Sequence, residues 1–272
     1  MPRPFLVLTD FTAAADTALR YAADLAKPLG ASLVLLHIRR ESLLDPDAFM
    51  GTIRHLTEGE VAAALEERTR GLAVSVTVES TADGIEAAVS DAVRRHHPGL
   101  VVLGKPDTEE TPDELVSSTS LKLLRATRTP LLVVPISHAA QVPPQRITIA
   151  ADDLPFSLKP QTEAIRELLG QLQPTITVEH VVEPEDRDDC IASRDAVLKS
   201  GLTAGISQVR THGVRHLHTA HGILQGAAET HADLLLVVAR RRSFLGQLFN
   251  RSVTSQVILH GRLPMLLLPA LE

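Results

Sequence analysis

The chain has 272 residues, 44% of them hydrophobic, and a single cysteine, so it is long enough for two soluble domains with their own cores and cannot contain an internal disulfide. A net charge of -6 and only 3% aromatic residues argue against a nucleic-acid-binding surface, which is normally basic and carries rings for base stacking. No stretch approaches the roughly 18 apolar residues of a membrane span and no signal peptide is recognisable, so we expect a cytoplasmic protein with neither nucleic acid nor membrane as a partner.

The first half of the chain predicts strands that alternate with helices. The strands are mostly continuous apolar runs such as Leu33-Val-Leu-Leu36, which is typical of a parallel sheet covered by helices on both faces. The predicted fold class is therefore α/β, with a doubly wound parallel sheet. We expect strands at 5–9, 32–38, 73–79, 100–104 and 131–134, and helices at about 14–29, 48–70, 84–96 and 115–126.

The second half repeats this order after a short linker. Residues 138–145 are polar and contain two prolines, which favours a boundary between a first domain at 1–137 and a second at 146–272. In the second domain we expect strands at 147–150, 176–182, 214–219, 234–238 and 265–268, and helices at about 158–172, 191–210, 222–231 and 253–259.

The two halves also share their first and last strands. Arg128-Thr-Pro-Leu-Leu-Val-Val-Pro135 closes the first half, and Arg262-Leu-Pro-Met-Leu-Leu-Leu-Pro269 closes the second. Each half begins with a short apolar run that is followed by an aspartate, Asp10 or Asp152. This internal repeat predicts a tandem duplication.

Four segments of the first half, in this order, carry a family resemblance: Leu6-Val-Leu-Thr-Asp-Phe-Thr12, Leu25-Ala26 with Gly30-Ala-Ser-Leu-Val-Leu-Leu-His-Ile38, Leu100-Val-Val-Leu-Gly104 and Thr129-Pro-Leu-Leu-Val-Val-Pro135. With them, nearly the whole chain resembles a tandem universal stress protein of the UspA-like family. The resemblance implies two five-stranded parallel domains of the adenine nucleotide alpha hydrolase-like kind, paired through strands 131–134 and 265–268 into an intramolecular pseudo-dimer. Such pairing would also cover two apolar strand edges.

Many members of that family resemble one another in a nucleotide site. An aspartate after the first strand contacts the base and ribose, and glycine-rich turns before the last helix hold phosphates through backbone N–H groups. In the first domain the resemblance implies five candidates: Thr9, Asp10, Gly104, Ser117 and Ser118. Asp107 replaces the second glycine, and loop 105–114 carries five carboxylates that would repel a triphosphate unless a divalent cation bridged them.

In the second domain the corresponding candidates are Asp152, Arg240, Arg242, Arg251 and Ser252. Ala239 takes the place of the first glycine, and segment 240–251 has four arginines and no acid, so guanidinium groups could hold phosphate instead. A solvated basic loop or a docking surface for an acidic partner are the alternatives. The apolar residues of the same segment indicate packing, with a further dimer as one outcome: Phe244, Leu245, Leu248 and Phe249. For Asp10 and Asp152, the alternative is a turn-forming or helix-capping role.

The densest histidine group is His212, His216, His218 and His221. His216 and His218 are expected on one strand face, where His221 could join them around zinc. The alternative, which we favour, is that these are strand and loop histidines bonded to carbonyl groups, so no metal site is predicted. His37 and His180 occupy matching positions in the two halves and indicate a structural role.

Catalytic motifs are missing from the sequence: it has no Gly-x-Ser-x-Gly elbow, no Walker A loop and no dinucleotide fingerprint. The leading hypothesis is a stress protein that acts by binding a nucleotide, another anionic ligand or a protein partner, with degenerate ATP-type sites and ATP as the candidate cofactor. One alternative is a weak metal-dependent enzyme that hydrolyses nucleotides or transfers phosphate. The other is a scaffold that works through protein contacts alone.

Overall fold

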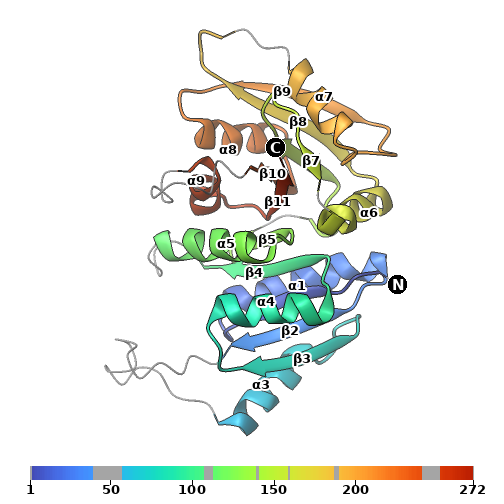
Figure 1. Cartoon of the computed structure of the whole chain (residues 1–272), viewed down its shortest axis with the longest axis vertical. Helices are drawn as coiled ribbons and strands as arrows, with labels where there is room; N and C mark the ends of the chain where they lie inside the picture. Colours follow the sequence, from blue (N-terminus) through green and yellow to red (C-terminus); the bar gives the residue numbers. More distant parts are fainter. Residues whose placement is uncertain are drawn as a thin grey trace.

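The computed structural model describes residues 2–38, 57–106, 113–138, 141–158, 160–186, 190–240 and 252–271, with the backbone alone at 113–118, 161 and 271. Two α/β halves lie one above the other along the long axis of the molecule (Figure 1). Among the described residues, no helix combines the length and the apolar character needed to cross a membrane.

The first half alternates strands and helices as predicted. Thr12 caps its first helix by accepting a hydrogen bond from the Ala15 N–H, and Thr57 forms a capping box with Glu60 at the start of another, as these residue types favour. The elements are β1 (Phe5–Thr9), α1 (Ala13–Ala26), η1 (Lys27–Leu29), β2 (Leu33–Ile38), α3 (Glu58–Thr69), β3 (Val76–Thr81), α4 (Ile85–His96), β4 (Leu100–Lys105), α5 (Asp113–Thr127) and β5 (Leu131–Pro135).

The second half repeats the order with one added short strand, β7. Its elements are β6 (Arg146–Ala150), β7 (Ser157–Leu158), η2 (Pro160–Thr162), α6 (Glu163–Leu172), β8 (Thr175–Val182), α7 (Ile191–Lys199), β9 (Val209–Arg215), α8 (Thr219–Glu229), β10 (Leu234–Ala239), α9 (Val253–His260) and β11 (Met265–Leu271).

One continuous sheet joins the halves, in the order β3-β2-β1-β4-β5-β11-β10-β6-β8-β9. The pairs within each half are parallel, apart from the short antiparallel pair of β7 with β11. Where the halves meet, β5 and β11 run antiparallel, and Leu132 pairs with Leu266. The predicted intramolecular pairing of the last strands is therefore confirmed.

Helices cover both faces of this sheet, as the apolar strands predict. One hydrophobic cluster includes Leu25 of α1, Leu65 of α3 and Leu169 of α6. The other includes Val89 of α4 and Ile223 of α8. Each cluster runs through both halves, so the two domains share their core layers.

Two predictions in the second half are wrong. The helix expected at 191–210 ends at Lys199, because Gly201 and Gly205 adopt φ values of +77° and +82°, which lie in the left-handed region that favours glycine. The following strand was expected at 214–219 but runs from Val209 to Arg215. Its polar and apolar residues are mixed because β9 is the outermost strand of the sheet.

Smaller differences concern element ends. The helix expected from residue 158 begins at Glu163, because Leu158 lies in β7 and pairs with Ala270 of β11. The strand expected at 73–79 is displaced to Val76–Thr81. Of the helix expected at 48–70, the structure shows Glu58–Thr69, and residues 48–56 lie outside the described residues.

Candidate functional site

At the carboxyl end of β1, Asp10 organises the turn into α1. Its Oδ1 accepts hydrogen bonds from the Thr12 N–H at 3.1 Å and from the Thr12 hydroxyl at 2.6 Å. Thr9 is buried, and its hydroxyl accepts from the Phe11 N–H. These contacts give Asp10 the turn-forming role that was its alternative, although its carboxylate is still exposed to solvent.

A stack of three side chains covers this turn. Phe11 has a φ of +66°, and its ring lies on that of His37, with centroids 4.1 Å apart. The Arg68 guanidinium carbon lies 4.7 Å from the Phe11 centroid, and Arg68 also bonds Asp16 and the Phe11 carbonyl. The carboxyl ends of β1 and β2 are thus occupied by protein side chains, an arrangement that the sequence reasoning missed.

Gly104, the candidate phosphate-binding glycine, has a packing role. A Cβ at this position would lie 2.3 Å from the Ala14 carbonyl oxygen and 2.7 Å from the Ala15 nitrogen. The missing side chain therefore lets the first turn of α1 rest on β4. Ser117 and Ser118 lie inside α5, which begins at Asp113, and not before the helix as a phosphate-binding turn requires; their side chains lie outside the described residues, as does Asp107.

The structure brings two candidates of the second domain together. Arg240 donates to the Asp152 carboxylate and to the carbonyl oxygens of Leu154 and Pro155. The Arg240 side chain is only 11% exposed, and its guanidinium carbon lies 5.9 Å from the Phe156 ring centroid. Arg240 and Asp152 therefore neutralise each other within the protein.

Ser252 is the N-cap of α9 and accepts a hydrogen bond from the Ser255 N–H at 3.1 Å.

Strand register corrects the alignment of the halves: Gly104 pairs with Val134 and Val238 with Leu268. Val238 is thus the counterpart of Gly104, and Ala239 is the counterpart of Lys105. Arg242, Arg251 and the apolar residues at 244–249 lie outside the described residues.

An open cavity of about 510 Å³ lies at the same edge of the second domain, between the 153–155 turn and α7. Asp153 and Asp195 contribute carboxylates, and Lys199 contributes an ammonium group. Ile191 on its wall is 48% exposed. With two acids against one base, the cavity is poorly suited to a polyphosphate.

Lys105 links the domains. It is 5% exposed, and its Nζ donates to the carbonyl oxygens of Leu259 and Gly261, at the C-terminal end of α9. A cation is favourable at this end of a helix, where carbonyl groups lack partners. Lys105 therefore stabilises the packing of the first domain against α9.

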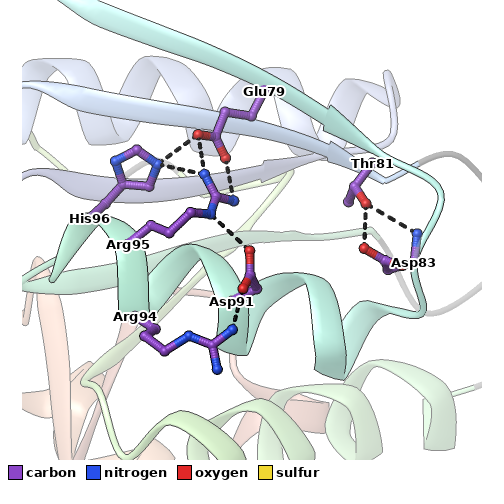
Figure 2. Close-up of polar contacts among 7 residues, drawn as sticks. All are labelled: Glu79, Thr81, Asp83, Asp91, Arg94, Arg95 and His96. Carbon is purple, nitrogen blue, oxygen red and sulfur yellow. Dashed lines mark hydrogen bonds and ion pairs between the residues drawn. The ribbon is translucent and has the colours of Figure 1, made fainter.

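The outer strand β3 is tied to α4 by an ion-pair network (Figure 2). Glu79 pairs with both terminal nitrogens of Arg95 at 2.5 and 2.8 Å and with His96 at 2.7 Å. Arg95 also bonds Asp91. Hydrogen bonding from Arg95, together with that from His96, lowers the Glu79 pKa despite an opposing effect of burial.

The second domain ties β9 to α8 at the matching positions, with the charges exchanged. His212, the counterpart of Glu79, lies 2.7 Å from Glu229, the counterpart of Arg95. Hydrogen bonds from Gln225 and His212 lower the Glu229 pKa. The outer strand thus supplies the acid in one domain and the imidazole in the other.

Beneath this second contact lies the buried carboxyl of Glu179. Among the described residues neither of its oxygens has a hydrogen-bond partner, and the residue is 1% exposed. It packs against Gly226 of α8, where a Cβ would lie 2.5 Å from the Glu179 Cδ. Burial, and secondarily the charge of Glu229, raise the pKa of Glu179 to about 9.

The histidines do not share a strand face as expected, because β9 ends at Arg215 and His218 is already the N-cap of α8. The rings of His216, His218 and His221 nevertheless gather within 5.8–6.0 Å of one another. His37 and His180 occupy equivalent register positions, opposite Ser80 of β3 and Gly213 of β9. The His37 Nδ1 lies 3.0 Å from the Thr9 carbonyl oxygen, which supports a structural role. Within the described ranges, no group of three or more His, Cys, Asp or Glu side chains could hold a metal ion.

Comparison with known proteins places this geometry in context. The family model described as "Universal stress protein family" matches residues 1–135 and again 144–269. A universal stress protein structure from Archaeoglobus fulgidus is 14% identical, with a TM-score of 0.69 over 97% of this chain and 95% of that one. A universal stress protein structure from Pseudomonas aeruginosa is 18% identical, with a TM-score of 0.57 over 99% and 94%. No curated protein matches the chain.

A third structure is described as a universal stress protein in complex with cAMP. It is 18% identical, with a TM-score of 0.37, and covers 50% of this chain and 98% of its own.

Proposed function

Since the chain belongs to the universal stress protein family, with two such domains in tandem, we propose that it acts by binding and not by catalysis, and that both of its ATP-type nucleotide sites are degenerate. Its ligand is then a small molecule other than an extended triphosphate, or a protein partner. We also propose a cytoplasmic location, which is favoured because the chain has a single cysteine, Cys190, and so contains no internal disulfide.

The observation that carries this proposal is that the described groups expected to hold a nucleotide are engaged in contacts within the protein. Asp152 and Arg240 bond each other, and Asp10 bonds Thr12. Gly104 accommodates α1, and Ser252 caps α9. A nucleotide would have to displace these contacts, which lowers its net binding energy.

Sterics support the same conclusion for the first domain. The Phe11 ring contacts both His37 and Arg68 at the carboxyl ends of β1 and β2, where doubly wound folds usually bind their ligands. A base could enter only after this stack opened. The acidic composition of loop 105–114 adds repulsion toward phosphate.

Calorimetric titration with ATP, AMP and cAMP, each with and without Mg²⁺, tests the proposal. We expect no saturable heat with ATP, and no release of inorganic phosphate during prolonged incubation with Mg-ATP. Thermal unfolding of the same sample verifies that the protein is folded. Saturable ATP binding at micromolar concentration, or turnover of Mg-ATP, would contradict the proposal.

A further inference from the structure

A cavity of about 230 Å³ lies at the amino-terminal edge of the sheet in the first domain. Arg3 borders it from the segment before β1, His97 from the segment before β4, and Thr129 from the segment before β5. Helix α4 contributes Ser90 and Arg94. We propose that this cavity binds a small phosphate-class anion through the guanidinium groups of Arg3 and Arg94, assisted by the imidazole of His97.

The cavity lies at the edge opposite the expected nucleotide site. Strands β1, β4 and β5 are parallel, so their amino-terminal ends share one edge, whereas Asp10 and Gly104 lie toward the other. A volume of about 230 Å³ is also below the roughly 300–1,000 Å³ of pockets that enclose drug-sized ligands. The cavity therefore fits a phosphate-sized anion better than a nucleotide. Its occupancy does not depend on whether the nucleotide sites are degenerate.

The lining of this cavity is basic. Among the described residues that border it are two arginines and a histidine, and neither an aspartate nor a glutamate. Guanidinium groups form paired hydrogen bonds with phosphate oxygens, and Ser90 adds a hydroxyl donor. Pro98 and Thr129 form a buried part of the wall, which limits water on that side and strengthens the attraction between opposite charges.

Arg3 is the cation of this cavity that has no partner in the protein. Arg94 bonds Asp91 of its own helix (Figure 2), and its guanidinium has further donors. Arg94 and His97 also complement the carbonyl groups at the end of α4. Arg3 belongs to no helix, and within the described part of the chain it takes part in no hydrogen bond or ion pair. A bound anion would give Arg3 its partner.

The same edge of the second domain holds an anion of its own. Asp233 is the counterpart of Gly99, because each directly precedes β10 or β4 and donates its N–H to a carbonyl group at the start of the first strand of its domain. The buried Asp233 carboxylate accepts hydrogen bonds from the N–H groups of Gln145 and Arg146, at 3.1 and 2.9 Å, and from the Arg146 guanidinium at 2.7 Å. This edge of the fold can therefore hold an oxyanion beside an arginine.

The first domain has no room for a carboxylate at the matching position. A Cβ at Gly99 would lie 2.6 Å from the Ala164 Cβ and 3.3 Å from the Arg3 Cβ. Ala164 of α6 thus fills the place of the Asp233 side chain, and Arg3 lies directly beside it. Since no described carboxylate pairs with Arg3, the anion that neutralises it comes from solution, through the adjoining cavity.

The test is a titration of the isotope-labelled full chain with inorganic phosphate and, separately, with glycerol phosphate, followed by NMR at constant ionic strength. We expect saturable shifts of the Ser90, His97 and Thr129 amide signals, with a dissociation constant of about 1 mM or lower, and none with sodium chloride. Saturation by inorganic phosphate supports a site for the free ion, and saturation by glycerol phosphate alone supports a site for a phosphorylated small molecule. No saturable shift of these signals with either compound would overturn the proposal.

The double variant Arg3→Gln/Arg94→Gln should bind phosphate about 100-fold more weakly, since each lost charged donor weakens binding about tenfold. The matched control is Arg215→Gln/Arg70→Gln, which removes the same charge. Arg215, like Arg3, has no ion-pair partner among the described residues. Arg70 pairs with a carboxylate of the helix it ends, as Arg94 does, and the two side chains are 74% and 78% exposed.

Arg70 follows α3, which covers the face of the sheet opposite to α4, so the control leaves the cavity intact. Circular dichroism checks that both variants are folded. Loss of saturable binding in Arg3→Gln/Arg94→Gln, with binding by the control equal to wild type, supports the site. Equal binding by wild type and Arg3→Gln/Arg94→Gln, or an equal loss in the control, would overturn it.

Discussion

Replacing Glu179 by leucine should stabilise the protein at neutral pH. Its carboxyl is buried without a hydrogen-bond partner in the described part of the chain, and its pKa is raised from 4.5 to about 9. Strand register pairs Leu36 with Leu8 and Glu179 with Ala150, so Leu36 is the counterpart of Glu179. The first domain therefore buries a leucine at the equivalent position.

The pH dependence follows from the direction of this shift. A carboxyl whose folded pKa is raised contributes its stability fully below pH 4.5 and loses it as the pH rises through about 9, since folding must take up a proton in between. Between pH 4.5 and about 9, each pH unit lowers the free energy of unfolding by about 1.4 kcal/mol, so the loss at pH 7 is about 3 kcal/mol. Glu179→Leu removes this cost and adds apolar burial.

Urea denaturation followed by circular dichroism between pH 5 and pH 9 measures the effect. We expect the free energy of unfolding of wild type to fall with pH relative to Glu179→Leu and Glu179→Gln. Glu179→Gln should lose the pH slope without the packing gain, because its amide is also unpartnered. Glu67→Leu on the exposed face of α3 is the control and should change stability by under about 0.5 kcal/mol. Equal pH slopes in wild type and Glu179→Leu would refute the reasoning.

Three further substitutions test individual contacts by urea denaturation. Gly104→Ala should lower the free energy of unfolding by about 1–3 kcal/mol, because its Cβ would collide with the Ala14 carbonyl. The control Gly59→Ala, which has open space in α3, should stabilise the protein slightly. Equal effects of the two substitutions would contradict the packing role of Gly104. Lys105→Met should lower the free energy of unfolding by about 2 kcal/mol and increase the rate of amide hydrogen exchange at the end of α9. The control Lys122→Met, at an exposed position, should leave both unchanged. Asp152→Asn should lower the free energy of unfolding by under about 1 kcal/mol, since the carboxylate is 43% exposed. Arg240→Met should lower it more, because two carbonyl groups also lose their donor. The reverse order would contradict the role of Arg240 in this turn.

The sequence predicted the fold well because the central strands are continuous apolar runs. β1 begins and ends where expected, and the pairing of β5 with β11 was anticipated from two similar chain endings. The outer strand β9 was misplaced, because all but one of its residues are exposed or half-buried and its polar and apolar residues are mixed. The helix predicted at 191–210 runs past the end of α7, because apolar periodicity alone does not show that Gly201 and Gly205 form turns there.

The candidate sites were harder to predict, since their contacts join distant parts of the chain. The Asp152–Arg240 pair spans 88 residues, and the Arg68 contact with Phe11 spans 57. Neither residue spacing nor composition indicates which guanidinium reaches which carboxylate. The one available signal was Phe11 directly after Asp10, a large ring in the turn where a ligand was expected.

The measurement that most directly tests the account is the titration of the full chain with ATP in the presence of Mg²⁺, compared with the variant Arg241→Ala/Arg242→Ala. We expect no saturable heat for wild type or for the variant, because the described groups expected to hold a nucleotide are engaged within the protein. Saturable binding by wild type that the variant loses would identify a working anion site in the second domain and contradict the claim of degenerate sites.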